Sequence, residues 1–131
     1  MTKRERLRQR VEAFRRAVRR LEDACRQEKN EFIRDSVIQR FEFCYELAWK
    51  MLKLKLEEED IDVRSPKQVL QVALELGLIE DGNAWTELHR MRNLTSHTYD
   101  EALAEEVYAF VCQTGLPLFQ RLADKARSWQ N

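Results

Sequence analysis

The sequence contains few of the residues that interrupt helices, with only three glycines and two prolines among 131 residues. It also lacks any apolar run approaching the roughly 20 residues that a membrane-spanning helix needs. No apolar stretch follows the charged residues 1–6, so the start of the chain does not read as a signal peptide. These absences predict a helical protein with no membrane segment, located in the cytoplasm.

Neither sign of charge dominates the chain, since 23 Lys and Arg balance 23 Asp and Glu. A formal net charge of zero gives no general electrostatic argument for nucleic-acid binding. The charge is uneven, because residues 1–29 hold eleven basic and five acidic side chains, a net of +6, and residues 57–62 hold five acids. Such runs are typical of solvated helix faces, an interpretation we favour over a phosphate-binding stripe.

The cysteines are too few and too widely spaced for a disulfide framework. Cys25, Cys44 and Cys112 are odd in number and lie on apolar faces of predicted helices. We therefore expect buried free thiols in a reducing compartment. No Cys-x-x-Cys pair is present and no histidine neighbours a cysteine, so the sequence predicts no metal site.

Helical spacing dominates between the few breaks. The apolar residues of segment 7–25 step by three and four, which predicts one face of a long first helix. A second long helix follows a polar break at residues 28–31, and we expect the bundle, alone or with a second subunit, to cover it on two sides. Its apolar stripe comprises Ile33, Val37, Phe41, Cys44, Ala48 and Leu52, broadened by Phe32, Ile38, Tyr45, Trp49 and Leu56. No segment alternates with the period of two that a strand requires.

Turn and capping residues divide the rest of the chain. Residues 65–68, Ser-Pro-Lys-Gln, are typical of a capping-box start, and Gly77 predicts the end of that third helix. Asp81 and Asp100 are placed to cap a fourth and a fifth helix. A glycine and a proline within residues 115–117 predict a kink or break. The expected fold is all-α, an antiparallel bundle of four or five helices in one domain spanning residues 1–131.

The segment most suggestive of function is residues 92–99, Arg-Asn-Leu-Thr-Ser-His-Thr-Tyr, which holds one of only two histidines. On a continuous helix Arg92 and Tyr99 would share a face, but His97 would lie about 140° away from Arg92. The three side chains can converge if the helix ends near Ser96, or across a two-fold axis that pools the residues of two copies.

An arginine beside a histidine suits phosphodiester chemistry. A guanidinium binds phosphate oxygens and stabilises developing charge, and an imidazole transfers protons near neutral pH. RNA supplies its own nucleophile, the 2′-hydroxyl, so this chemistry needs no metal or cofactor. Spacing alone favours a structural interpretation over catalysis, because Arg92 and His97 in a last helical turn would also favour the helix dipole and bind terminal carbonyls. Tyr99 has alternatives too: it buries its ring at the turn, or it orients phosphate or accepts a modification.

Nearby charged residues allow two interpretations as well. Glu42 and Glu46 lie one helical turn apart, where pairing with Arg40 or Lys50 is expected at a surface. The alternative is an acid that faces the motif and orients Arg92, with Glu42 as the candidate supporting residue. The second histidine, at position 89, has no obvious carboxylate partner and is interpreted as a surface or bundle residue.

Residues 91–100 resemble the signature of HEPN-domain proteins, and most closely that of the HepT-like, or nucleotidyltransferase substrate-binding, branch. Segments 39–47 and 73–79, followed by Trp85, are similar to helical regions of the same branch. The resemblance implies a helical bundle that dimerises, with the Arg–His motifs of both subunits lining one cleft. Active members are metal-independent ribonucleases, so it implies catalytic roles for Arg92 and His97, with Asn93 at a common polar position.

The resemblance also implies partners and regulation. HepT-like toxins are encoded beside an MNT-type nucleotidyltransferase antitoxin, which adds AMP to the motif tyrosine, here Tyr99, and silences the toxin. The expected partners are therefore RNA, a second copy of the chain to form a homodimer, and the nucleotidyltransferase, with a hetero-oligomer as a further alternative. An alternative for this branch is a non-catalytic substrate-binding subunit of the nucleotidyltransferase. A purely structural helical dimer is a third hypothesis.

Overall fold

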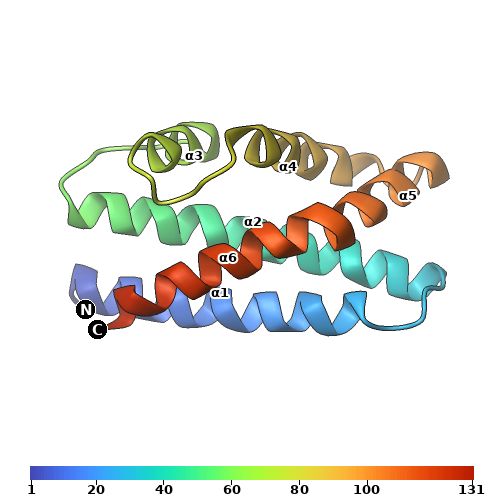
Figure 1. The fold of residues 1–131 in the computed structure, drawn as a ribbon, viewed down its shortest axis with the longest axis horizontal. Coiled ribbons are helices and arrows are strands. Elements are labelled where there is room, and N and C mark those ends of the chain that lie inside the picture. The colour runs from blue at the N-terminus through green and yellow to red at the C-terminus, as the bar shows by residue number, and fades with distance from the viewer.

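A computed structural model describes all 131 residues as a bundle of helices without a strand (Figure 1). In chain order the elements are α1 (Lys3–Cys25), α2 (Glu31–Glu58), α3 (Pro66–Glu75), α4 (Gly82–Leu94), the 3₁₀ turn η1 (Thr95–His97), α5 (Glu101–Phe110), the π-helical turn η2 (Val111–Gly115), α6 (Leu116–Ala126) and the 3₁₀ turn η3 (Arg127–Gln130). Because α5, η2 and α6 are continuous, they form one kinked helix, and five helical rods make up the bundle. This confirms the predicted all-α bundle.

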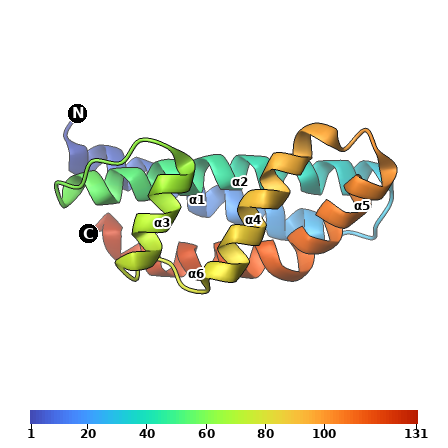
Figure 2. The same ribbon diagram turned by 90° about the horizontal axis from the view of Figure 1, so that it is seen from above.

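The two long helices α1 and α2 form the base of the bundle. They run antiparallel and pack along their length, and α6 lies against α1. The shorter helices α3 and α4 pack on α2, and the view from above shows them crossing over it (Figure 2). Both chain termini lie at the same end of the molecule (Figure 1). None of the helices combines the length and apolar character needed to cross a bilayer.

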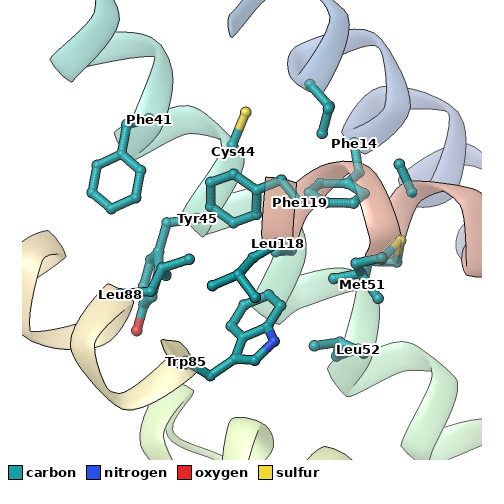
Figure 3. Packing of buried hydrophobic residues seen from close by; sticks show 14 of the residues in the cluster. Phe14, Phe41, Cys44, Tyr45, Met51, Leu52, Trp85, Leu88, Leu118 and Phe119 are labelled. Atoms are coloured by element: carbon teal, nitrogen blue, oxygen red, sulfur yellow. The ribbon is translucent and has the colours of Figure 1, made fainter. Parts of the chain in front are cut away.

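Aromatic side chains from four helices meet at Phe119 of α6. Its ring centroid lies 6.0 Å from that of Phe14 on α1, 5.9 Å from Phe41 on α2 and 6.1 Å from Trp85 on α4. Figure 3 shows these residues among the other apolar side chains of the core. Edge-to-face and tilted rings of this kind add to the free energy gained by burying their apolar area. The cluster thereby fixes α4, the helix that leads into the motif, against the rest of the bundle.

Local capping sets the helix boundaries as the sequence predicted. The side chains of Ser65, Asp81 and Asp100 each accept backbone N–H groups at the start of α3, α4 and α5. One detail differs, because the Gln68 side chain accepts from the Arg64 N–H at 2.9 Å and does not close a capping box with Ser65. These side chains satisfy one N–H group at the start of α3, one at the start of α4 and two at the start of α5.

The expected kink near Pro117 is a π-helical turn. The Leu116 N–H donates to the Val111 carbonyl, five residues earlier. Proline lacks an N–H, and its ring clashes with the carbonyl four residues before it, so a widened turn accommodates Pro117 without ending the helix. The chain thus bends at η2 and continues as α6 across the bundle.

Two expectations about burial were wrong. Phe32, assigned to the apolar stripe of the second helix, is 81% exposed, because α2 begins beyond the part that α3 and α4 cover. Cys25 and Cys112 are only half-buried, and they are in contact, although 87 residues separate them. Cys44 alone is a buried thiol, as predicted for all three.

Candidate functional site

The motif occupies the point where α4 ends and the chain turns towards α5. The helix ends at Leu94, and the hydroxyls of Thr95, Ser96 and Thr98 each donate to the carbonyl three residues earlier. The Asp100 N–H donates to the carbonyl of His97, the last residue of η1. These local bonds explain why the helix stops within the motif, close to the predicted position.

Arg92 is held by contacts on its inner side. Its Nη1 donates to the Thr95 Oγ1 at 3.1 Å, and its Nη2 lies 3.7 Å from the Glu46 Oε1. The guanidinium carbon is 5.8 Å from the centroid of the Tyr45 ring, in a cation–π arrangement. The Nε atom is buried and has no hydrogen-bond partner in the chain. The side chain as a whole is 28% exposed, so a positioned cation remains accessible to an anionic ligand.

A tyrosine–histidine pair lies beneath this arginine. The Tyr45 hydroxyl and the His89 Nδ1 are 2.6 Å apart, joining α2 to α4. Burial raises the pKa of Tyr45 to about 12. Burial also lowers the pKa of His89, and the charges of Lys67 and Arg92 lower it further. Both groups are therefore neutral near pH 7, and one hydrogen bond joins them, donated by the hydroxyl or by Nδ1 according to the imidazole tautomer.

His97 and Tyr99 lie on the surface, edge to face. Their ring centroids are 6.1 Å apart with an interplanar angle of 72°. Tyr99 is 83% exposed and its hydroxyl makes no hydrogen bond within the chain, which overturns the interpretation of a buried ring. Its ring has no core to enter, because the turn carries it away from the bundle. The hydroxyl is therefore accessible to a modifying enzyme.

An open groove of about 560 Å³ separates Tyr99 from the first half of α2. Thr98 and Tyr99 form one wall, and the other is lined by Phe32, Asp35, Ser36, Ile38, Gln39 and Glu42. Its charged lining residues are both acids, with no base among them. A polyanion would therefore be repelled from the groove of a single copy, unless a cation from elsewhere entered it.

The structure brings some of the predicted site residues together and leaves others apart. Glu46, rather than Glu42, is the acid that contacts Arg92, while Glu42 lines the groove beside Tyr99. Asn93 is exposed. No hydrogen bond, ion pair or ring contact joins Arg92 to His97 within the chain, so the turn at the end of α4 does not by itself assemble an Arg–His pair.

Sequence reasoning missed Arg34, a buried cation at the start of α2. Its guanidinium forms ion pairs with Asp35 at 3.1 Å, Glu101 at 2.6 Å and Glu105 at 3.2 Å. The hydrogen bonds that Arg34 donates to Glu101 and Glu105 raise the pKa of its guanidinium. These bonds tie α5, which follows the motif directly, to α2. Helical spacing could have indicated that Arg34 is buried, since residues 34, 37, 38, 41 and 45 share the buried face of α2.

Comparison with known proteins identifies the family of this chain. A family described as nucleotidyltransferase substrate binding protein like matches residues 9–128. The chain belongs to this family. Probable ribonuclease HepT from Haemophilus influenzae is 47% identical over 77 residues, which cover 55% of the chain and 53% of that protein. The match thus spans about half the length of this curated relative. Together these findings confirm the resemblance to the HepT-like branch of HEPN proteins.

Solved structures support the same assignment for this member of the nucleotidyltransferase substrate binding protein-like family. A protein from Thermus thermophilus superposes with a TM-score of 0.73 at 32% identity, covering 90% of this chain and 98% of the other. A Haemophilus influenzae protein, described as revealing the fold of a substrate binding domain of a nucleotidyltransferase, superposes with a TM-score of 0.67 at 32% identity. That comparison covers 95% of this chain and 98% of the other.

Proposed function

We propose that the chain is the HepT-like toxin of a HEPN/MNT toxin–antitoxin pair, a metal-independent endoribonuclease of the cytoplasm. The observation that carries the proposal is the arrangement of the motif. Arg92 is a positioned, accessible cation, and exposed His97 and Tyr99 rings follow it on the turn after α4. Family membership and the relative named probable ribonuclease HepT support the same function.

The proposed chemistry uses groups of the protein and of RNA alone. Arg92 binds the non-bridging oxygens of the scissile phosphate and stabilises their charge in the transition state. His97 removes the proton from the adjacent ribose 2′-hydroxyl, whose oxygen attacks phosphorus. The bond to the 5′-oxygen breaks, and that oxygen receives the proton from the His97 imidazolium. The products carry a 2′,3′-cyclic phosphate and a 5′-hydroxyl.

The Arg92 and the His97 of one site come from two copies of the chain in this proposal. Arg92 and His97 do not meet within one chain, so a two-fold axis beside the motif would pool two of each. Exposed Phe32 and Tyr99 border the groove at this surface, and large apolar side chains in such positions suit burial by a partner. Arginines from the second copy would also neutralise the acids of the groove.

Mixed dimers test this arrangement. Arg92→Ala and His97→Ala should each abolish cleavage of RNA. In heterodimers purified after co-expression with two different affinity tags, one intact Arg92 and one intact His97 remain, on different copies. If the pair acts across the two-fold axis, cleavage returns in the heterodimer. Inactive heterodimers that are folded and dimeric would contradict the shared site.

Tyr99 is the proposed acceptor of regulatory AMP. Its hydroxyl oxygen would attack the α-phosphorus of ATP in the partner nucleotidyltransferase, and pyrophosphate would leave. The attached AMP adds bulk and negative charge beside Arg92 and His97, which blocks the entry of RNA. Co-expression with the neighbouring nucleotidyltransferase should add the mass of one AMP group to the wild-type chain and none to Tyr99→Phe. An unchanged adduct on Tyr99→Phe would place the acceptor elsewhere.

A second candidate function is a non-catalytic subunit that binds substrate for a nucleotidyltransferase. The family description favours it, as does the acidic lining of the groove beside Tyr99. This candidate predicts a tight complex with the partner enzyme and no cleavage of RNA by the chain alone. Measuring cleavage and complex formation on the same preparation separates the two functions, because only the toxin is active without its partner.

A further inference from the structure

Cys25 and Cys112 form an isolated pair of thiols between α1 and the kinked helix. Cys25 is the last residue of α1, and Cys112 lies within the π-helical turn η2. Their Sγ atoms are 2.7 Å apart, and each residue is half-buried. Two nucleophilic groups from distant parts of the chain thus meet at a place that solvent can reach, away from the motif.

The separation of the two sulfur atoms is close to that in a disulfide bond. A disulfide holds its sulfur atoms about 2.05 Å apart, so the two Sγ atoms would need to move closer to each other by less than about 1 Å. Cys112 belongs to a widened turn, where the helix already departs from regular geometry. A small adjustment of this turn and of the last residue of α1 can supply the movement without displacing the core.

The surroundings shift the pKa values of the two thiols in opposite directions, which makes Cys112 the nucleophile. Hydrogen bonds with Cys25 and, to a lesser extent, with Tyr108 lower the pKa of Cys112 to about 7 despite the opposing effect of burial. The same thiol contact and burial raise the pKa of Cys25. Near neutral pH Cys112 is therefore partly thiolate, the reactive form of cysteine. Cys44 is fully buried, and burial raises its pKa to about 12, so it stays a protonated, shielded thiol.

We propose that Cys25 and Cys112 are a peroxide-sensitive dithiol, a modification site that closes to an intramolecular disulfide. The Cys112 thiolate attacks one oxygen of hydrogen peroxide, the O–O bond breaks, and the hydroxide released takes up a proton to leave as water. Cys112 is then a sulfenic acid. The Cys25 sulfur attacks the Cys112 sulfur, the S–O bond breaks, and the Cys25 proton leaves with the hydroxide as a second water. Two thiols are oxidised and one peroxide is reduced.

The disulfide would fasten the end of α1 to the helix that follows the motif. It closes a large loop that contains α2, α3, α4 and the motif itself, and such a link restricts the unfolded chain. The oxidised protein should therefore unfold at a higher temperature than the reduced one. This modification is independent of the proposed ribonuclease activity, since neither cysteine lies in the motif or its groove.

Intact mass spectrometry tests the proposal. Protein reduced with a phosphine and then freed of it is treated with hydrogen peroxide, unfolded in the presence of N-ethylmaleimide and weighed. The reduced chain should take up three maleimide groups, one for each free cysteine, and the oxidised chain only one. Proteolysis without reduction should then release one cross-linked peptide pair, joining the segments that contain Cys25 and Cys112.

Variants identify the two sulfurs. Cys44→Ser is the matched control and should form the disulfide as readily as wild type. Cys25→Ser should accumulate a sulfenic acid on Cys112 that dimedone traps, and Cys112→Ser should resist mild peroxide. Three maleimide groups after peroxide treatment, a cross-link through Cys44, or a disulfide only between two chains would overturn the proposal. The peptide map of the wild-type chain identifies the linked cysteines even where a variant folds poorly.

Discussion

Replacing Thr95 with valine separates the positioning of Arg92 from the stability of the fold. The Thr95 hydroxyl donates to the Arg92 carbonyl at 2.7 Å and accepts from the Arg92 Nη1 at 3.1 Å. Valine keeps the shape of the side chain and removes both bonds. Each is worth about 0.5–1.5 kcal/mol net, and the second counts for less because the arginine is partly exposed to water. We expect the free energy of unfolding to fall by roughly 1–2 kcal/mol.

Thermal unfolding followed by circular dichroism measures this loss. An entropy of unfolding of about 2.1 cal/mol/K per residue gives roughly 0.28 kcal/mol/K for a chain of 131 residues. The expected fall in Tm for Thr95→Val is therefore about 4–7 °C. In the same variant the guanidinium loses the hydroxyl that orients it, so cleavage of RNA should slow about tenfold, the equivalent of about 1.4 kcal/mol.

Thr95→Ser is the matched control. It keeps the hydroxyl and loses one buried methyl group, which costs about 0.8 kcal/mol and lowers Tm by about 3 °C, somewhat less than the valine variant. It should nevertheless retain cleavage close to that of wild type. Equal cleavage by Thr95→Val and wild type, or an equal loss in both variants, would show that this hydroxyl does not position Arg92.

Two further predictions concern the pair beneath the arginine. Tyr45→Phe removes the hydroxyl that lies 2.6 Å from the His89 Nδ1, so urea titration should show a loss of about 1 kcal/mol; an unchanged unfolding midpoint would count against that bond. In the folded chain His89 has a pKa below its ordinary value of 6.5. As the pH falls towards 6.5, the unfolded chain therefore binds more protons than the folded chain. Stability should therefore decline as the pH falls below about 6.5, and urea titrations from pH 7 to about 5 should show a flatter dependence for His89→Asn. An identical slope in both proteins would contradict the assignment.

The sequence predicts helix boundaries well where they depend on neighbouring residues. Asp81 and Asp100 cap the helices expected of them, because a capping side chain binds N–H groups only two or three residues away. The kink at Pro117 follows from the missing N–H and the bulk of the proline ring. In each case the physical cause lies within one helical turn and is visible in the sequence.

Contacts between helices could not be predicted from neighbouring residues as the helix boundaries were. The pairs Arg34–Glu101 and Tyr45–His89 join residues far apart in the chain, and helical periodicity gives the face of a residue but not its partner on another helix. The same holds for Cys25, whose thiol contact was missed. Periodicity also placed Phe32 on the apolar face of α2, although no other helix covers it. The motif was recognisable by its residue types and spacing, but its arrangement in space required the fold.

In the proposed function, residues 92–99 form a metal-independent ribonuclease site. The most direct measurement incubates purified total RNA with wild type, His97→Ala and Ser96→Ala in excess EDTA. Ser96 is an exposed neighbour whose hydroxyl only donates to the Asn93 carbonyl, so its replacement is the matched control. Intact mass must first show that Tyr99 carries no AMP. We expect cleavage by wild type and by Ser96→Ala but none by a folded His97→Ala protein. Intact RNA in all three reactions, or undiminished cleavage by His97→Ala, would contradict it.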